Sequence, residues 1–211
     1  MTPEEITPFS EVERDALCEL ANVAMARAAA SLRQMVGHQI LLTVPTCDIL
    51  AREKVSERIL KAGNSNLVAV RQDFSGPFWG RALLIFPELG SLELMRAILG
   101  RQLRAEDILD LEDEALAETG NVILNSWVAT IANLLKQGLK MSLPAVIRRD
   151  PYHIVDSVGS PGACILFLDV KFEISHHEVR GYVALMMDLP SVAHLRSLIA
   201  ALLKKLNSDT P

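Results

Sequence analysis

Hydrophobic side chains recur at helical spacing near the start of the chain. The recurring positions are Leu17, Leu20, Ala24, Ala28, Leu32 and Met35. Gly37 follows them where a helix commonly ends, so a first long helix is predicted here. Asp15, Glu19 and Asn22 fall on its other side at i, i+4 and i+7, which places them along one stripe. The pattern predicts a helix that buries an alanine-rich face and exposes an Asp–Glu–Asn stripe to water.

From Ile40 the spacing changes from helical to alternating. The alternation runs up to Pro45, which is typical of an edge strand or a bulge. Residues 50–65 are polar and are interpreted as a long hairpin connection. Three elements are predicted to follow: strands at about 66–74 and 78–86 and a short helix at 88–99. Trp79 falls within the second of these strands and is predicted to lie in the core.

The second half of the chain repeats the same order of patterns. A long helix is predicted from about Glu106 to Gly138, with Trp127 on its apolar side. Its opposite stripe consists of Glu114, Glu118, Asn121 and Asn125. The elements predicted after it are strands at about 151–158, 162–174 and 179–188, a hairpin turn at 175–178 and a final helix from Pro190 to about Leu206. Each half therefore contains a long helix, three strands and a short helix.

This internal repetition defines the predicted fold class. Neither half has enough strands to close a core alone, so we predict an α+β fold in which helices pack on one long antiparallel sheet shared by both halves. In this interpretation residues 1–211 form a single pseudo-two-fold symmetric domain of two helix-β-β-β-helix repeats. Repeat one spans about 10–100 and repeat two about 106–206. Because the chain already supplies a two-fold pairing, we expect a monomer.

A polar motif occurs twice in the chain, 99 residues apart. Each copy has a Glu, an Asn three residues later and a Pro twenty-three residues after the Asn, with an acid four residues before the Glu. The first copy is Asp15, Glu19, Asn22 and Pro45, and the second is Glu114, Glu118, Asn121 and Pro144. One such stripe alone is typical of a solvated helix face. Two copies, each closed by a proline at the same distance, indicate a duplicated polar site.

The residue types in the motif restrict the chemistry of this site. A carboxylate can pair with a lysine or arginine of a partner, and an amide can hydrogen-bond and orient a water molecule. Asn is neither an effective base nor a nucleophile, so the pair suits the positioning of water and not covalent catalysis.

Composition narrows the functional classes further. Half of the residues are hydrophobic and 22% are charged, so a folded globular chain is expected. A net charge of −5 without a basic run argues against nucleic-acid binding. No stretch resembles a signal peptide or a membrane span, so a cytoplasmic protein without membrane insertion is expected.

The sequence also lacks the usual signatures of a bound metal or nucleotide. It has no Gly-rich phosphate loop, no nucleophile elbow and no zinc motif. His176 and His177 are expected in an exposed turn, and Cys18, Cys47 and Cys164 are interpreted as reduced core residues. We therefore expect the protein to carry no cofactor of its own.

The doubled Glu-x-x-Asn motif with its prolines resembles the CheC family of response-regulator phosphatases, which belongs with CheX and FliY. The resemblance covers about residues 10–205, and CheC is the better match because CheX-type proteins generally hold one such site and FliY carries an added switch domain. It implies a chemotaxis phosphatase that hydrolyses the aspartyl phosphate of a CheY-like receiver, with Mg²⁺ held by the phosphorylated receiver. It further implies that Glu19 and Glu118 pair with the receiver's lysine and that Asn22 and Asn121 position the attacking water.

The two copies fit the family pattern unequally. Ala21 precedes Asn22 and Ala24 follows two residues later, where the family usually has glycines, whereas Gly120 precedes Asn121. Glu114 stands where a Ser or Asp is usual. We rank the second copy above the first and expect both to be competent.

Two rival interpretations stay open. The first is an adaptor without hydrolytic activity that binds a receiver or a CheD-like deamidase through the same helices. The second is a structural component of a flagellar switch, against which we weigh the lack of an added switch domain. A soluble α+β domain with no role for its exposed acids is the least informative alternative. The sequence does not identify the receiver or the output that it controls.

Overall fold

A computed structural model of the chain describes residues 9–37, 39–99, 105–156, 164–174 and 177–208. This described part is an α+β fold with six helices and one seven-stranded antiparallel sheet. The helices are α1 (Glu11–Val36), α2 (Arg52–Lys61), α3 (Glu88–Leu99), α4 (Ala105–Leu134), α5 (Pro151–Asp156) and α6 (Leu189–Ser208). The strands are β1 (Ile40–Ala51), β2 (Leu67–Ser75), β3 (Gly80–Pro87), β4 (Lys140–Met141), β5 (Ala145–Arg149), β6 (Cys164–Ile174) and β7 (His177–Met187).

The sheet interlocks the two halves of the chain. Its strand order is β1-β6-β7-β3-β2-β4, and β5 also pairs with β2. Strand β1 of the first half pairs with β6 of the second half. Strands β4 and β5 of the second half pair with β2 of the first half, and β3 and β7 join the halves in the middle. This arrangement confirms the predicted antiparallel sheet with helices packed on it.

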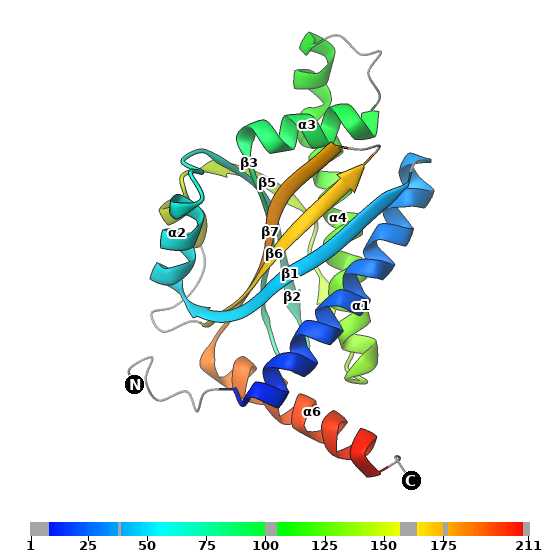
Figure 1. The fold of residues 1–211 in the computed structure, drawn as a ribbon, viewed down its shortest axis with the longest axis vertical. Helices are drawn as coiled ribbons and strands as arrows, with labels where there is room; N and C mark the ends of the chain where they lie inside the picture. Colours follow the sequence, from blue (N-terminus) through cyan, green and yellow to red (C-terminus); the bar gives the residue numbers. More distant parts are fainter. Residues whose placement is uncertain (1–8, 38, 100–104, 157–163, 175–176, 209–211) are drawn as a thin grey trace.

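Two helical layers cover opposite faces of the sheet. Val68 and Val70 of β2 belong to the core under α1 and α4, whereas Leu67 and Ala69 belong to the core under α2 and α5. This division follows from the alternation of side chains along a strand. Figure 1 shows α1 and α2 on opposite sides of the sheet, with α3 and α6 at its two ends.

Local sequence signals fix both ends of α1. The Ser10 side chain accepts a hydrogen bond from the Glu13 backbone N–H at 3.2 Å, and the Glu13 carboxylate accepts from the Ser10 N–H at 2.7 Å, which forms a capping box. Gly37 ends the helix in the left-handed conformation, with a φ of 77°, as its position predicted. Fully buried alanines on the inner face, Ala21, Ala24 and Ala28, allow close packing.

Two predicted segments and one predicted core residue were wrong. Residues 50–65 include helix α2, because Val55 and Ile59 lie one turn apart and are fully buried among charged neighbours. Residues 151–158 begin with helix α5 instead of a strand. The Asp150 carboxylate caps this helix by accepting from the backbone N–H groups of residues 152 and 153, at 3.0 and 3.1 Å. Trp79 is 53% exposed, because the adjacent Phe78 takes the inward position.

The two motif prolines lie on the edge strands of the sheet. β1 does not end at Pro45 but continues to Ala51, with a shift of register between Thr43 and Thr46. Pro144 lies in the gap between β4 and β5, which both pair with β2. The predicted edge or bulge position of Pro45 is therefore confirmed.

Part of the predicted turn at 175–178 lies outside the described residues, namely 175 and 176. His177 and Glu178 belong to β7. Within the described ranges, no helix is long and apolar enough to cross a membrane.

Candidate functional site

The first motif copy lies on the outer face of α1. Glu19, Asn22 and Asp15 are all exposed, whereas Ala21 is fully buried against the sheet side. Within the described part of the chain, Glu19 forms no ion pair and the Asn22 amide has no hydrogen-bond partner. The predicted stripe is therefore present and open to a partner.

The second copy lies on α4, which packs on β2 at this point. Glu118 and Glu114 are exposed, and Glu118 forms no ion pair with any described residue. Gly120 is buried, and a Cβ atom added to it would lie 2.5 Å from the Val70 Cβ. Only a glycine allows α4 to pack so closely on β2 at this point.

This close approach brings the Asn121 side chain into a polar network. The Asn121 Oδ1 accepts from the Gln72 Nε2 at 3.1 Å and from the Asn125 Nδ2 at 2.5 Å. The Gln72 Nε2 also donates to the Ser142 carbonyl oxygen at 2.9 Å. Asn121 and Asn125 are half-buried and not fully exposed as the predicted stripe required. The network directs the Asn121 carbonyl inward and leaves its Nδ2 group to donate outward.

The segment that carries Pro144 is anchored beside this network. The Ser142 N–H donates to the Asp73 carbonyl oxygen at 2.8 Å, and the Ser142 hydroxyl accepts from the Asp73 N–H at 2.9 Å. Because Gln72 bonds to both Asn121 and Ser142, the structure links the motif asparagine to the motif's proline segment. No such link joins Asn22 to Pro45 among the described residues.

Gln72 is the site residue that sequence reasoning missed. It is 1% exposed, in a strand whose neighbouring inward positions, Val70 and Phe74, are apolar. A polar side chain at an inward position of an alternating strand is a detectable signal, because a buried amide needs hydrogen-bond partners. Its partners could not be read from the sequence, since Asn121 lies 49 residues away.

The corresponding positions of the first copy are apolar. α1 and α4 correspond at an offset of 99 residues, so Ala26 stands in place of Asn125 and Ala21 in place of Gly120. In the β2–β3 strand pair, Gln72 lies opposite Ala82. In the corresponding β6–β7 strand pair of the second half, Val170 lies opposite Gly181 at the matching place. Val170 therefore stands in place of Gln72, and Asn22 has no corresponding hydrogen-bond donor from the sheet.

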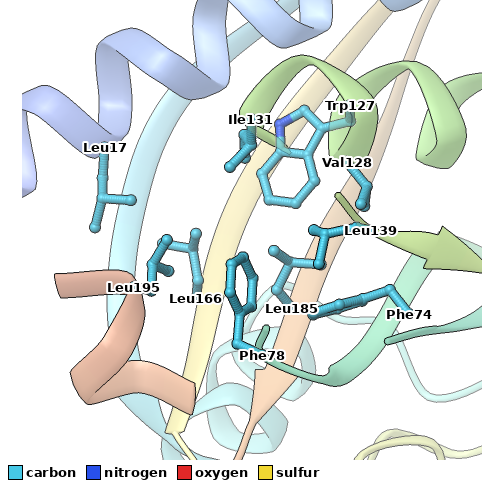
Figure 2. A pocket seen from close by; sticks show the side chains of 10 residues that line it. All are labelled: Leu17, Phe74, Phe78, Trp127, Val128, Ile131, Leu139, Leu166, Leu185 and Leu195. Carbon is cyan, nitrogen blue, oxygen red and sulfur yellow. The ribbon is translucent and has the colours of Figure 1, made fainter. Parts of the chain in front are cut away.

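The described residues contain no cluster of His, Cys, Asp and Glu that could hold a metal ion. The cavity in Figure 2 is lined by apolar side chains only, among them Leu17 of α1, Trp127 of α4 and Leu195 of α6. Trp127 is fully buried as predicted. None of the residues of the two Glu–Asn pairs lines this cavity, so it is not part of the candidate site.

Cys18 and Cys47 are half-buried and form no disulfide. The Cys18 Sγ lies 3.7 Å from the Cys47 carbonyl oxygen, and burial raises the pKa of the Cys47 thiol well above its usual range. This environment keeps Cys47 protonated, as expected of a reduced core residue. The side chain of Cys164 lies outside the described set.

Comparisons with known proteins match the chain to chemotaxis phosphatases. The family model described as "Chemotaxis phosphatase CheX" matches residues 68–168. The "CheY-P phosphatase CheC" of Bacillus subtilis (strain 168) is 24% identical over 199 residues, which are 89% of this chain and 93% of that protein. These two matches make the chain similar to the CheX family model and to CheC.

A second curated relative is longer than this chain. The "Flagellar motor switch phosphatase FliY" of Bacillus subtilis (strain 168) is 22% identical over 144 residues, which are 67% of this chain but only 37% of FliY. The alignment thus covers about a third of that relative.

Solved structures show the same fold. Thermotoga maritima FliY superposes with a TM-score of 0.72 and 19% identity, covering 91% of this chain and 98% of that one. The FliM middle domain of Vibrio alginolyticus has a TM-score of 0.62 and 15% identity, covering 87% and 99%. A chain of the CheX–CheY–BeF3–Mg complex from Borrelia burgdorferi has a TM-score of 0.50 and 14% identity, covering 80% of this chain and 98% of that one.

Proposed function

We propose that this protein is a phosphatase that hydrolyses the aspartyl phosphate of a CheY-like response regulator. The observation that carries the proposal is the second motif copy. An unpaired carboxylate, Glu118, lies one helical turn from an amide, Asn121, whose orientation is fixed by two donors. The name of the CheC relative, a CheY-P phosphatase, and the CheX–CheY complex support a receiver domain as the partner.

The proposed mechanism divides the work between the two side chains. The Glu118 carboxylate pairs with the lysine beside the receiver's phosphorylated aspartate and fixes the geometry of the complex. The Asn121 Nδ2 group donates to a water molecule and holds it in line with the bond between phosphorus and the aspartate oxygen. The water attacks phosphorus, that bond breaks, and inorganic phosphate leaves while the receiver's carboxylate is restored.

Positioning alone can supply much of this catalysis. An acyl phosphate is already labile, and its transfer needs alignment and charge stabilisation more than a protein nucleophile. The receiver supplies Mg²⁺ to stabilise the charge on phosphate. Both functional side chains of each pair are borne on one rigid helix, so the approach of the receiver sets both contacts together. We propose the same roles for Glu19 and Asn22 at the first copy.

The test is the decay of a phosphorylated CheY-type receiver in the presence of Mg²⁺, with and without the protein. The control is the quadruple variant Glu19→Ala/Asn22→Ala/Glu118→Ala/Asn121→Ala, in which all four exposed or half-buried groups are truncated. We expect the wild-type protein to accelerate the loss of phosphate from the receiver. With the quadruple variant, the receiver should lose phosphate only at the rate that it shows alone. An unchanged decay with wild-type protein, across several receivers, would refute the phosphatase.

The alternative function is that of an adaptor for a receiver or a CheD-like deamidase. The likeness to a FliM middle domain favours keeping this alternative, because the fold is not confined to proteins named as phosphatases. An adaptor would bind the beryllofluoride-activated receiver without shortening the lifetime of the phosphorylated form. The same decay assay, combined with a binding measurement, therefore separates the two functions.

A further inference from the structure

We infer that Gln72 and Asn125 are positioning residues that hold Asn121 in one amide orientation and make the second pair the principal catalytic site. This inference rests on the proposed phosphatase function. The two Glu–Asn pairs are expected to differ in catalytic rate, and Gln72 and Asn125 are the residues that cause the difference.

We call the hydrogen bonds that hold Asn121 its brace. They run from Asn121 through Gln72 to Ser142 and end at backbone groups of Asp73. Gln72 donates through one nitrogen to the Asn121 Oδ1 at 3.1 Å and to the Ser142 carbonyl oxygen at 2.9 Å. Ser142 is itself held by both backbone groups of Asp73. Asn125, one turn along α4, supplies the second donor at 2.5 Å. Gln72 is 1% exposed, so solvent does not compete for its bonds.

Two donors facing one oxygen select a single state of the amide. Rotation of the Asn121 side chain by a half-turn would place its NH₂ group against the NH₂ group of Gln72, which the Ser142 carbonyl oxygen holds in place, and lose that bond. The carbonyl therefore faces the protein, and the Nδ2–H donor faces the place of the attacking water. An amide that is already oriented does not lose this rotational freedom when the receiver binds.

The first pair has none of these groups. Val170 and Ala26 stand where Gln72 and Asn125 would be, and neither side chain can donate a hydrogen bond. Asn22 is exposed, so its amide is free to rotate and to bond with bulk water. The first pair must order its amide in the complex, which lowers its rate relative to the second pair.

The inference is tested in the background Glu19→Ala/Asn22→Ala, where only the second pair remains. Gln72→Leu and Asn125→Ala each remove one donor to Asn121. We expect each to lower kcat for the phosphorylated receiver by about three- to tenfold, the value of one neutral hydrogen bond, with KM unchanged. Asn125→Gln keeps a donor and should retain most of the activity.

The matched control is Ser126→Ala on the same helix. Ser126 is half-buried like Asn125 and hydrogen-bonds the Ser31 hydroxyl at 3.3 Å, but it does not contact Asn121. Its removal should leave kcat within about twofold. If Gln72→Leu fails to fold because the site is buried, the half-buried Asn125 still provides the test. An unchanged kcat in Asn125→Ala, or a rise in KM alone, would overturn the inference.

A second readout separates this inference from the proposed function. Side-chain ¹⁵N relaxation of the free protein reports the motion of each asparagine NH₂ group without any receiver. We expect the Asn121 group to be rigid, the Asn22 group to be mobile, and Asn125→Ala to release Asn121. Equal mobility of the two groups would refute the brace even if the protein is a phosphatase. A protein that accelerates no receiver, with a rigid Asn121, would refute the phosphatase and leave the brace intact.

Discussion

At the residue scale, one glycine decides how close the second pair lies to the sheet. Gly120 faces Val70, with no room for a Cβ atom between them. The corresponding Ala21 in α1 is accommodated and fully buried. The close approach at Gly120 matters because Asn121 reaches Gln72 only when α4 is close to β2.

Gly120→Ala should therefore destabilise the fold and weaken the site together. We expect a loss of about 1–3 kcal/mol in the free energy of unfolding, since the added methyl group overpacks the helix–sheet contact. Urea denaturation measures this loss. Gly138→Ala is the matched control, because a Cβ atom there meets nothing within 4 Å. Equal stabilities of the two variants would contradict the close approach.

At the scale of elements, the hydrophobic period predicted the parts with strong patterns and missed the short ones. The long helices and the strands β2, β3, β6 and β7 follow sustained patterns, and their boundaries came close to those expected. α2 was missed because only two apolar side chains, Val55 and Ile59, anchor a mostly charged segment. α5 is six residues long, too short for a helical period to show.

The candidate site divides in the same way. The Glu and Asn positions followed from spacing along one helix, which is local information. The brace of Asn121 depends on the register of β2 against α4, which joins residues 49 positions apart. Single-sequence reasoning does not reach such a contact, although the inward polar Gln72 signalled that one was needed.

The start of α1 gives a prediction for pH. Donation from the Ser10 N–H, with the Arg196 guanidinium at 3.1 Å, holds the pKa of Glu13 below its usual value of 4.5. A lowered folded-state pKa means that the ionised carboxylate stabilises the fold above pH 4.5, and that this contribution is lost as pH falls through the folded-state value. Glu13→Gln should cost about 1 kcal/mol at neutral pH and less in acid.

Denaturant unfolding at neutral and acidic pH measures this difference. The stability gap between wild type and Glu13→Gln should shrink in the more acidic buffer. A gap that is the same at both pH values would show that the Glu13 charge makes no contribution to the cap.

At the scale of the whole molecule, the interlocked sheet carries two related Glu–Asn pairs within one chain. β1 pairs with β6 and β5 pairs with β2, so each half completes the sheet of the other. α1 and α4 pack side by side on one face, with a hydrogen bond between Ser31 and Ser126. The shared scaffold places two Glu–Asn pairs on neighbouring helices, while their surroundings have diverged to apolar at one pair and polar at the other. That the protein is a monomer stays a prediction.

The measurement that tests this account most directly is the decay of a phosphorylated CheY-type receiver with each pair removed in turn. Glu19→Ala/Asn22→Ala should keep most of the acceleration. Glu118→Ala/Asn121→Ala should lose most of it, because losing an oriented donor costs a rate factor of about 10²–10³ at that site. A quadruple variant as active as wild type would contradict the assignment of both pairs. A loss confined to the first pair would contradict the principal role of the braced Asn121.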